Sequence, residues 1–277
     1  IGKKAYNPGL KNVVKFVSTL NLPVDSLNLI HVGGTNGKGS TSSYISSILQ
    51  ESNYQVGIFS SPHFFDFRER IKINNQKISK SFIVDFVNKY KSLIEELELS
   101  FFELSFCISL AYFVHNDVDY GVIEVGLGGR LDATNIINPL ISVITNISYD
   151  HTDILGNSLE MIALEKAGIF KKNSTIIIGE RNDSVDEIFI NKANEVSSKI
   201  TFVPDYNDQK QYSSVNYLNT NIKTAIYTCK ALNIENVDNN SIMTGISNIN
   251  KNCHLIGRWS IISENPRVIF DAAHNLA

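Results

Sequence analysis

The sequence has few cysteines and no long apolar run, and both absences exclude classes of protein. Its three cysteines, Cys107, Cys229 and Cys253, lie far apart with no C-x-x-C pair, which argues against a disulfide framework and for reduced thiols. No run approaches the roughly 18 to 20 apolar residues of a membrane span. The first ten residues also lack the apolar stretch of a signal peptide. We therefore expect a soluble, cytoplasmic protein.

An excess of one charge is also missing. The 25 basic and 28 acidic residues leave a formal net charge of -3, so no strong field attracts nucleic acid or an anionic membrane. We expect neither as a partner. Because 43% of the 277 residues are apolar and 19% are charged, the chain can bury a large core, and disorder is not expected.

Short apolar runs alternate with longer segments of helical periodicity, which is the pattern of an α/β domain. Near-continuous Val and Ile runs are typical of parallel strands that are covered on both faces. The polar stretch 202–215 is expected to be an exposed excursion. We expect strands at 28–32, 55–60, 120–125, 141–145, 174–178 and 267–271, helices at 40–52, 81–97, 103–115, 184–197 and 217–232, and a hairpin at 71–78. The predicted fold is α/β, with a mostly parallel P-loop-type sheet flanked by helices and a small additional β hairpin.

A glycine-rich segment between the first predicted strand and helix is a candidate phosphate loop. Backbone N–H groups and the dipole at a helix start bind anions, and glycine lets the backbone approach phosphate oxygens. Lys38 is placed to reach the β and γ phosphates, and Ser40 to bind magnesium. Only two residues separate Gly34 from Gly37, whereas the usual P-loop has four, so this loop is a shorter variant. The alternative is a simple Gly-rich turn. The candidate ATP-binding residues here are Gly34, Thr35, Asn36, Gly37, Lys38, Gly39 and Ser40.

Glu124 is a candidate metal ligand because it interrupts the apolar strand YGVIEV near its end. A buried carboxylate is costly unless it is paired or metal-bound. At the carboxyl end of a parallel strand it faces the crevice where ligands bind. The alternative is a pairing with a nearby lysine or arginine.

The segment YDHTD, after the strand at 141–145, is ambiguous on its chemistry alone. A lone histidine such as His151 is more often a hydrogen-bonded structural residue than a metal ligand. Asp150 and Asp153 could cap the helix that begins near Ser158. The residues by themselves do not decide between these roles.

Lys166, in the segment EKAGIF, ends that predicted helix. Its simplest role is to offset the negative end of the helix dipole, with Gly168 as the C-cap.

Seven segments together resemble the folylpolyglutamate synthase and dihydrofolate synthase family, within the Mur ligase superfamily. They run in the family's order from about His31 to Asn275 and cover nearly the whole chain. Any one of them is weak evidence, but seven in order are hard to obtain by chance. The segments are HVGGTNGKGS, GIFSSPHFFDFRERI, EVGLGGRLDATN, DHTDILG, EKAGIF, GRW and FDAAHN.

The resemblance implies two magnesium ions and assigns residues to them. Ser40, Ser61 and Glu124 match the ligands of the first ion. His151 matches a ligand of the second, and Lys166 matches a lysine that is typically carbamylated in relatives, supplying a carbamate oxygen near that ion. This interpretation gives Lys166 a role beyond the helix end.

The resemblance also assigns residues to ATP. Asn221 matches an asparagine near the adenine, and Arg258 an arginine that reaches the phosphates from a hinge. Asp271 and His274 match residues of the C-terminal domain that contact ATP, the aspartate at the ribose. The catalytic group implied in this way comprises Lys38, His151, Lys166 and Arg258.

The segment SSPHFFDFRERI resembles a mobile loop that helps to bind the pterin. Its phenylalanines Phe64 and Phe65 could equally belong to the core. The residues alone leave both interpretations open.

Two domains follow from the resemblance. Residues 1–257 correspond to an ATP-binding Mur ligase-like domain, and residues 258–277 to the hinge and first strand of a C-terminal glutamate-ligase domain that is mostly missing. The glutamate site of the family lies between the two domains, so this chain could not close it.

The implied reaction is ATP-dependent amide formation by a monomeric enzyme. ATP phosphorylates the carboxylate of dihydropteroate or of a folate, and the amine of L-glutamate attacks the acyl phosphate. Two metals and Lys38 neutralise charge on the phosphates. The alternatives are a murein-precursor amino-acid ligase, a small-molecule kinase with a P-loop, and a nucleotide-binding module that is inactive in this truncated form.

Overall fold

The computed structural model describes residues 9–204, 211–272 and 275, and within them one sheet has eight strands in the order β4-β3-β2-β5-β1-β6-β7-β8. The strands from β2 to β8 in this order are parallel, and β3 and β4 join the β2 edge antiparallel. The predicted α/β fold with a mostly parallel sheet is confirmed. The strands of the sheet are β1 Leu29–Gly33, β2 Val56–Phe59, β3 Ile71–Ile73, β4 Gln76–Lys77, β5 Tyr120–Glu124, β6 Ile141–Ile144, β7 Thr175–Ile178 and β8 Lys199–Phe202.

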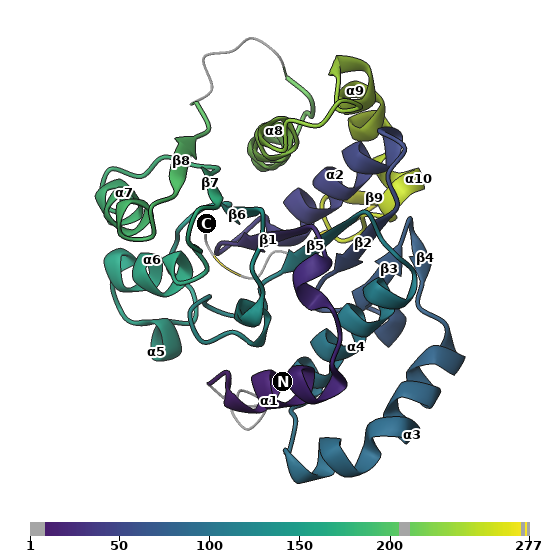
Figure 1. Ribbon diagram of the computed structural model, residues 1–277. Coiled ribbons are helices and arrows are strands. Elements are labelled where there is room, and N and C mark those ends of the chain that lie inside the picture. Colours follow the sequence, from purple (N-terminus) through teal and green to yellow (C-terminus); the bar gives the residue numbers. More distant parts are fainter. Residues whose placement is uncertain (1–8, 205–210, 273–274, 276–277) are drawn as a thin grey trace.

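Helices cover both faces of this sheet (Figure 1). Helices α2, α8 and α9 pack on one face, whereas α1, α3 and α4 lie on the other, which α6 and α7 extend beside β7 and β8. In the described part of the chain, none of the helices has both the length and the hydropathy needed to cross a bilayer. The helices are α1 Lys11–Leu20, α2 Lys38–Glu51, α3 Lys80–Glu96, α4 Phe101–His115, α5 Thr152–Leu155, α6 Leu159–Ala167, α7 Asp186–Glu195, α8 Asn216–Ala231, α9 Asn239–Ser247 and α10 Ile249–Cys253, with short 3-10 turns η2 Val24–Ser26, η3 Phe67–Arg70 and η4 Ala133–Ile136.

The apolar strands fill both layers of the core. In β1, Leu29 packs with α1 and α4 while Ile30 and Val32 pack with α2. This alternation follows from the two-residue period of a strand. Because both faces are covered, the strand reads as a continuous apolar run.

The order of the strands places three loops together. The chain runs from β1 out to β2, returns to β5 between them, and then crosses to β6 on the other side of β1. The carboxyl ends of β1, β5 and β6 therefore lie at the same edge, next to the point where the direction of winding changes. In α/β sheets this is where ligands bind.

Most predicted elements occur within a few residues of their expected bounds. The predicted hairpin turns at Asn74 and Asn75, whose φ angles of 43° and 64° suit the tight turn that asparagine tolerates. The helices α1, α5, α9 and α10 and the strands β8 and β9 (Ser260–Glu264) were not predicted. For α1 a signal was present, because Val13, Phe16 and Leu20 form one buried face.

A second, two-stranded sheet follows α10. Strands β9 Ser260–Glu264 and β10 Arg267–Phe270 pair antiparallel. The side chains of Ile261, Ile262 and Val268 in this hairpin are exposed.

The three cysteines are free and buried in different parts of the molecule. Cys107 lies on α4 in the core layer with α1, and Cys229 lies on α8 in the opposite layer. Cys253 ends α10, and its Sγ lies 3.2 Å from the carbonyl oxygen of Ser43 on α2. Burial raises the pKa of all three thiols, that of Cys253 to about 11.

Candidate active site

The predicted phosphate loop forms between β1 and α2, and the loop after β6 holds it in place. The N–H of Thr35 donates to the carbonyl oxygen of Asn146 at 3.0 Å, and the N–H of Asn36 donates to Asn146 Oδ1 at 2.9 Å. The first turn of α2 then presents its N–H groups at the crevice, as an anion site requires. Asn146 was not predicted as a site residue, although its place directly after a buried strand was a usable signal.

Position 37 requires glycine for two reasons, its backbone conformation and the side chain next to it. Its φ is +80°, and a Cβ at this position would lie 2.1 Å from Oδ1 of Asn221 on α8. Asn221 is 6% exposed. The structure therefore brings the predicted Asn221 directly against the phosphate loop.

A Gly37→Ala variant is expected to lower the free energy of unfolding by about 2 kcal/mol, because L-residues resist a positive φ and the methyl group meets Asn221. Urea unfolding measures this loss. In an Asn221→Ala background the same change should cost less, since the side chain that excludes the methyl group is gone. Equal losses in both backgrounds would contradict this explanation.

Two lysines converge on one backbone carbonyl in the loop. Lys38 Nζ donates to the carbonyl oxygens of Gly34 at 2.9 Å and Thr35 at 2.8 Å, and Lys166 Nζ donates to Gly34 O at 2.9 Å. Burial lowers the pKa of both, and it lowers that of Lys166 to about 7, with a further contribution from the charge of Lys38. An anion between the two amines would relieve this repulsion.

Lys166 lies in the last turn of α6, but its ammonium group contacts the phosphate loop. Its side chain is 4% exposed and points into the site. Gly168 does occupy the C-cap, but with a right-handed φ of -60°. A Cβ there would lie 2.4 Å from Cβ of Arg130, so this glycine permits close packing rather than a left-handed turn.

Glu124 ends β5 facing the first turn of α2. The carboxylate is 4% exposed, accepts a hydrogen bond from the N–H of Ser61 at 3.0 Å, and would lie 3.6 Å from a Cβ on Gly39. Burial raises its pKa, opposed by the charge of Lys38. Ser40 Oγ is buried and has no hydrogen-bond partner among the described residues.

This donor set fits a hard cation. A carboxylate and a hydroxyl are oxygen ligands of the kind that Mg²⁺ takes together with phosphate oxygens and water. In the residues that the structure describes, no group of three or more His, Cys, Asp or Glu side chains could hold a metal by itself. Ser61 contacts Glu124 through its backbone N–H, and Gly39, next to Ser40, faces the same carboxylate.

His151 lies at the edge of the site. It precedes α5 with a φ of 49°, its side chain is 51% exposed, and its Nε2 is 3.8 Å from Asp150 Oδ1. Asp150 faces the site: its Oδ2 accepts a hydrogen bond from Asn275 Nδ2 at 3.1 Å, and its charge opposes the lowering of the pKa of Lys38 and Lys166 by burial. The sequence left open whether Asp150 and Asp153 cap α6, and the structure assigns that role to the side chain of Ser158.

The C-terminal residues reach the same edge. Arg258 lies close enough to Lys38 and Glu124 to shift the pKa of each. Asn275 pairs with Asn36 of the loop through two amide hydrogen bonds of 2.9 and 3.0 Å, and it was not predicted. The predicted His274 lies outside the described residues.

Two donors from the described part of the chain bind the carboxylate of Asp271. Its Oδ2 accepts hydrogen bonds from Tyr217 Oη at 2.9 Å and from the N–H of Trp259 at 2.8 Å. Tyr217 lies in the first turn of α8 and was not predicted as a site residue.

The segment after β2 is exposed rather than core. The exposed fractions of Phe64 and Phe65 are 38% and 84%, and the ring centroid of Phe64 lies 5.3 Å from that of Phe270 in β10. The interpretation of these two residues as core is therefore wrong.

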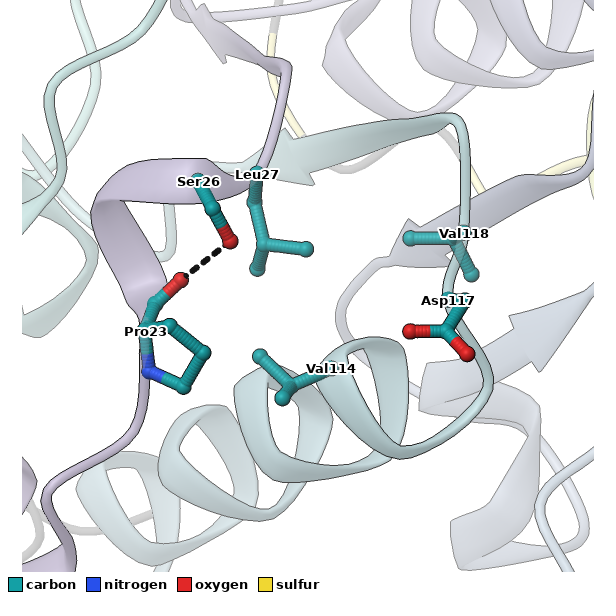
Figure 2. Close-up of a pocket in the computed structure, with 6 residues that line it drawn as sticks. All are labelled: Pro23, Ser26, Leu27, Val114, Asp117 and Val118. Carbon is teal, nitrogen blue, oxygen red and sulfur yellow. Dashed lines mark hydrogen bonds between the residues drawn. The ribbon is translucent and has the colours of Figure 1, made fainter.

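A cavity of about 200 Å³ lies elsewhere, between η2 and the end of α4 (Figure 2). It borders the amino ends of β1 and β5, opposite the phosphate loop. It contains none of the predicted site residues. Its lining is Pro23, Ser26, Leu27, Val114, Asp117 and Val118.

Comparisons with known proteins agree with this geometry. The Mur ligase middle domain matches residues 32–253. The dihydrofolate synthase/folylpolyglutamate synthase of Bacillus subtilis is 33% identical over 304 residues, which cover 99% of this chain and 70% of that protein. The Escherichia coli protein of the same name is 34% identical over 287 residues, covering 98% and 67%.

Solved structures give the same result. Escherichia coli FolC in complex with DHPP and ADP matches with a TM-score of 0.86 at 33% identity, over 99% of this chain and 68% of that one. A bifunctional folylpolyglutamate synthase/dihydrofolate synthase with Mn, AMPPNP and L-glutamate bound matches with a TM-score of 0.83 at 29% identity, over 98% and 68%. The chain thus spans about two thirds of the length of these relatives.

Proposed function

Because this chain belongs to the dihydrofolate synthase/folylpolyglutamate synthase family of Mur ligases, we propose that it carries the ATP-binding part of a ligase that joins L-glutamate to a folate or dihydropteroate carboxylate. One observation carries the proposal: Lys38, Lys166 and Glu124 meet at the start of α2. Two amines beside free helical N–H groups favour a polyphosphate. A buried carboxylate next to them favours the metal that accompanies it.

The proposed reaction has two steps. The γ-phosphoryl group of ATP passes to an oxygen of the substrate carboxylate, which gives ADP and an acyl phosphate. The amine of L-glutamate then attacks the acyl carbon, loses a proton, and phosphate leaves. Lys38 would exchange its two carbonyl partners for phosphate oxygens, and Arg258 would neutralise charge from the hinge. The ligands named for the relatives, ADP with DHPP and AMPPNP with L-glutamate, support these substrates.

Two metal sites belong to the proposal. Ser40, Ser61 and Glu124 would hold one Mg²⁺, and His151 with a carbamate on Lys166 would hold a second. Bound magnesium would polarise the phosphoryl group and offset its charge. The low pKa of Lys166 supports the carbamate, because only a neutral amine adds CO₂.

Carbamylation of Lys166 should appear in the native mass. At pH 8 with bicarbonate we expect a gain of about 44 Da over the sequence mass, lost on acidification. A Lys166→Arg variant should show no such gain, whereas Lys171→Arg should retain it. A gain that persists in Lys166→Arg would contradict the assignment.

We propose that residues 1–257 form the ATP-binding domain and that 258–277 begin a second one. The β9–β10 sheet supports this boundary, since two strands with exposed apolar side chains are marginally stable by themselves. The three buried thiols support the reducing cytoplasm as its location. That the enzyme is monomeric stays a prediction.

Phosphate release by the complete ligase tests the function. ATP, magnesium and L-glutamate are supplied with either dihydropteroate or tetrahydrofolate. We expect release that requires both glutamate and a pterin, and the preferred pterin identifies the step.

Other outcomes point to other functions. Release without glutamate would identify a kinase, and release with a UDP-linked precursor alone would identify a murein-precursor ligase. No release, with nucleotide binding retained, would identify a binding module.

A further inference from the structure

Tyr217 joins the two parts of the molecule that border the phosphate loop. It lies in the first turn of α8, which packs against α2. Its hydroxyl donates to Oδ2 of Asp271, just after β10 and 54 residues further along the chain. The N–H of Trp259 donates to the same oxygen, so one donor from the helix and one from the residue before β9 hold this carboxylate.

The position of Tyr217 on α8 relates it to the loop. Tyr217 and Asn221 are four residues apart and therefore share one face of the helix, about 6 Å apart along its axis. Asn221 lies against Gly37 of the loop. The Tyr217–Asp271 pair thus lies about one helical turn from the phosphate loop, a distance on the scale of a ribose ring.

The two ends of this face of α8 lie near residues of opposite charge. Lys38 marks the phosphate end, and the charge of Arg258 acts on both Lys38 and Tyr217. A carboxylate such as Asp271 would repel phosphates. It is suited to the hydroxyl groups of a ribose, which acidic residues bind at other nucleotide sites.

From this geometry we infer that Tyr217 is a positioning residue, whose hydroxyl fixes the carboxylate of Asp271 for the ribose of the nucleotide. The inference rests on the proposed function, because it adds a residue to the ATP site proposed there. Burial and the neighbouring carboxylate raise the pKa of Tyr217 to about 12. The hydroxyl therefore remains a donor at neutral pH.

The test compares three ligands by titration calorimetry of this chain with magnesium: ATP, 2′,3′-dideoxy-ATP and inorganic tripolyphosphate. Tyr217→Phe removes only the hydroxyl and should weaken ATP binding about tenfold. The binding of dideoxy-ATP and tripolyphosphate should change less than about twofold, because neither presents ribose hydroxyls. Tyr227→Phe, at an exposed position of the same helix, is the matched control and should leave all three affinities unchanged.

The pair is tested by combining variants. If Tyr217 acts through Asp271, Tyr217→Phe should cost little in an Asp271→Asn background. An equal loss for all three ligands, an unchanged affinity for ATP, or full additivity with Asp271→Asn would overturn the inference while leaving the ATP site standing. A wild-type chain that binds none of the three would overturn the proposed function as well.

Discussion

A Lys38→Ala variant is expected to lose at least about 100-fold in affinity for ATP while its fold is retained. Among the described residues, Lys38 Nζ donates only to carbonyl oxygens of its own loop, so we expect its removal to leave the fold intact. With ATP bound, a partly buried ammonium group beside the phosphates contributes about 2–5 kcal/mol. Calorimetry of ATP binding measures the loss, and circular dichroism measures the fold. In the complete ligase, turnover should fall below detection.

Lys171→Ala is the matched control. Lys171 is also a partly buried lysine whose pKa burial lowers, and its Nζ donates to the carbonyl oxygen of Asn135 at 2.8 Å. It lies outside the phosphate loop, so this variant should bind ATP as the wild type does. An affinity of Lys38→Ala within about threefold of wild type would remove the loop from the nucleotide site.

A Glu124→Gln variant is expected to reverse the effect of magnesium on ATP binding. The amide keeps the shape of the side chain and can still accept from Ser61 N–H, but it no longer attracts a cation. With magnesium, ATP affinity should fall by about 10- to 100-fold. Without magnesium it should stay or rise, because a carboxylate that repels the phosphates has gone.

Glu103→Gln provides the control for Glu124→Gln. Glu103 is likewise buried, at 3% exposure, but it caps α4 by accepting from the N–H of Ser100. Glutamine serves equally well in a capping box, so magnesium dependence should be unchanged. A Glu124→Gln variant with the magnesium dependence of wild type would show that this carboxylate does not hold the metal.

The same variant also carries a pH prediction. Because burial raises the pKa of Glu124, the folded state binds its proton more tightly than the unfolded state does. The stability that this tighter proton binding contributes is fully present below the ordinary carboxyl pKa of about 4.5. It is lost as pH rises through the raised pKa of Glu124 in the folded state. Metal-free Glu124→Gln should therefore be more stable than wild type at pH 7, and the gap should narrow towards pH 5. Thermal unfolding across this range measures the gap.

The central sheet was predictable because its strands obey a simple rule. A strand such as β5, covered on both faces, must be apolar throughout, and only Glu124 interrupts it. The edge strand β8 was harder to predict, because it is half exposed and its sequence KITF contains no continuous apolar run. The helices α9 and α10 are rich in asparagine. Because asparagine has a weak helix propensity, their sequences carry little helix signal, and packing on α2 stabilises them.

For the site, the sequence identified residues whose chemistry is unusual in their place, such as Lys38 after a glycine and Glu124 in an apolar strand. It could not identify those whose role comes from contacts distant in sequence. Tyr217 reaches Asp271 across 54 residues, and Asn275 reaches Asn36 across 239. The role of Asp150 stayed open in the sequence, because its proximity to the two lysines is set by the fold.

The three buried thiols lie in different layers of the molecule, so chemical labelling can follow the exposure of each one separately. A thiol reagent attacks only when its cysteine is exposed, so the labelling of Cys107 follows opening of the α1–α4 layer and that of Cys229 follows opening of the α2–α8 layer. Cys253 reports detachment of α10 from α2. Mass-resolved labelling of the native protein in dilute urea would therefore give the order in which the layers come apart, with no engineered probe.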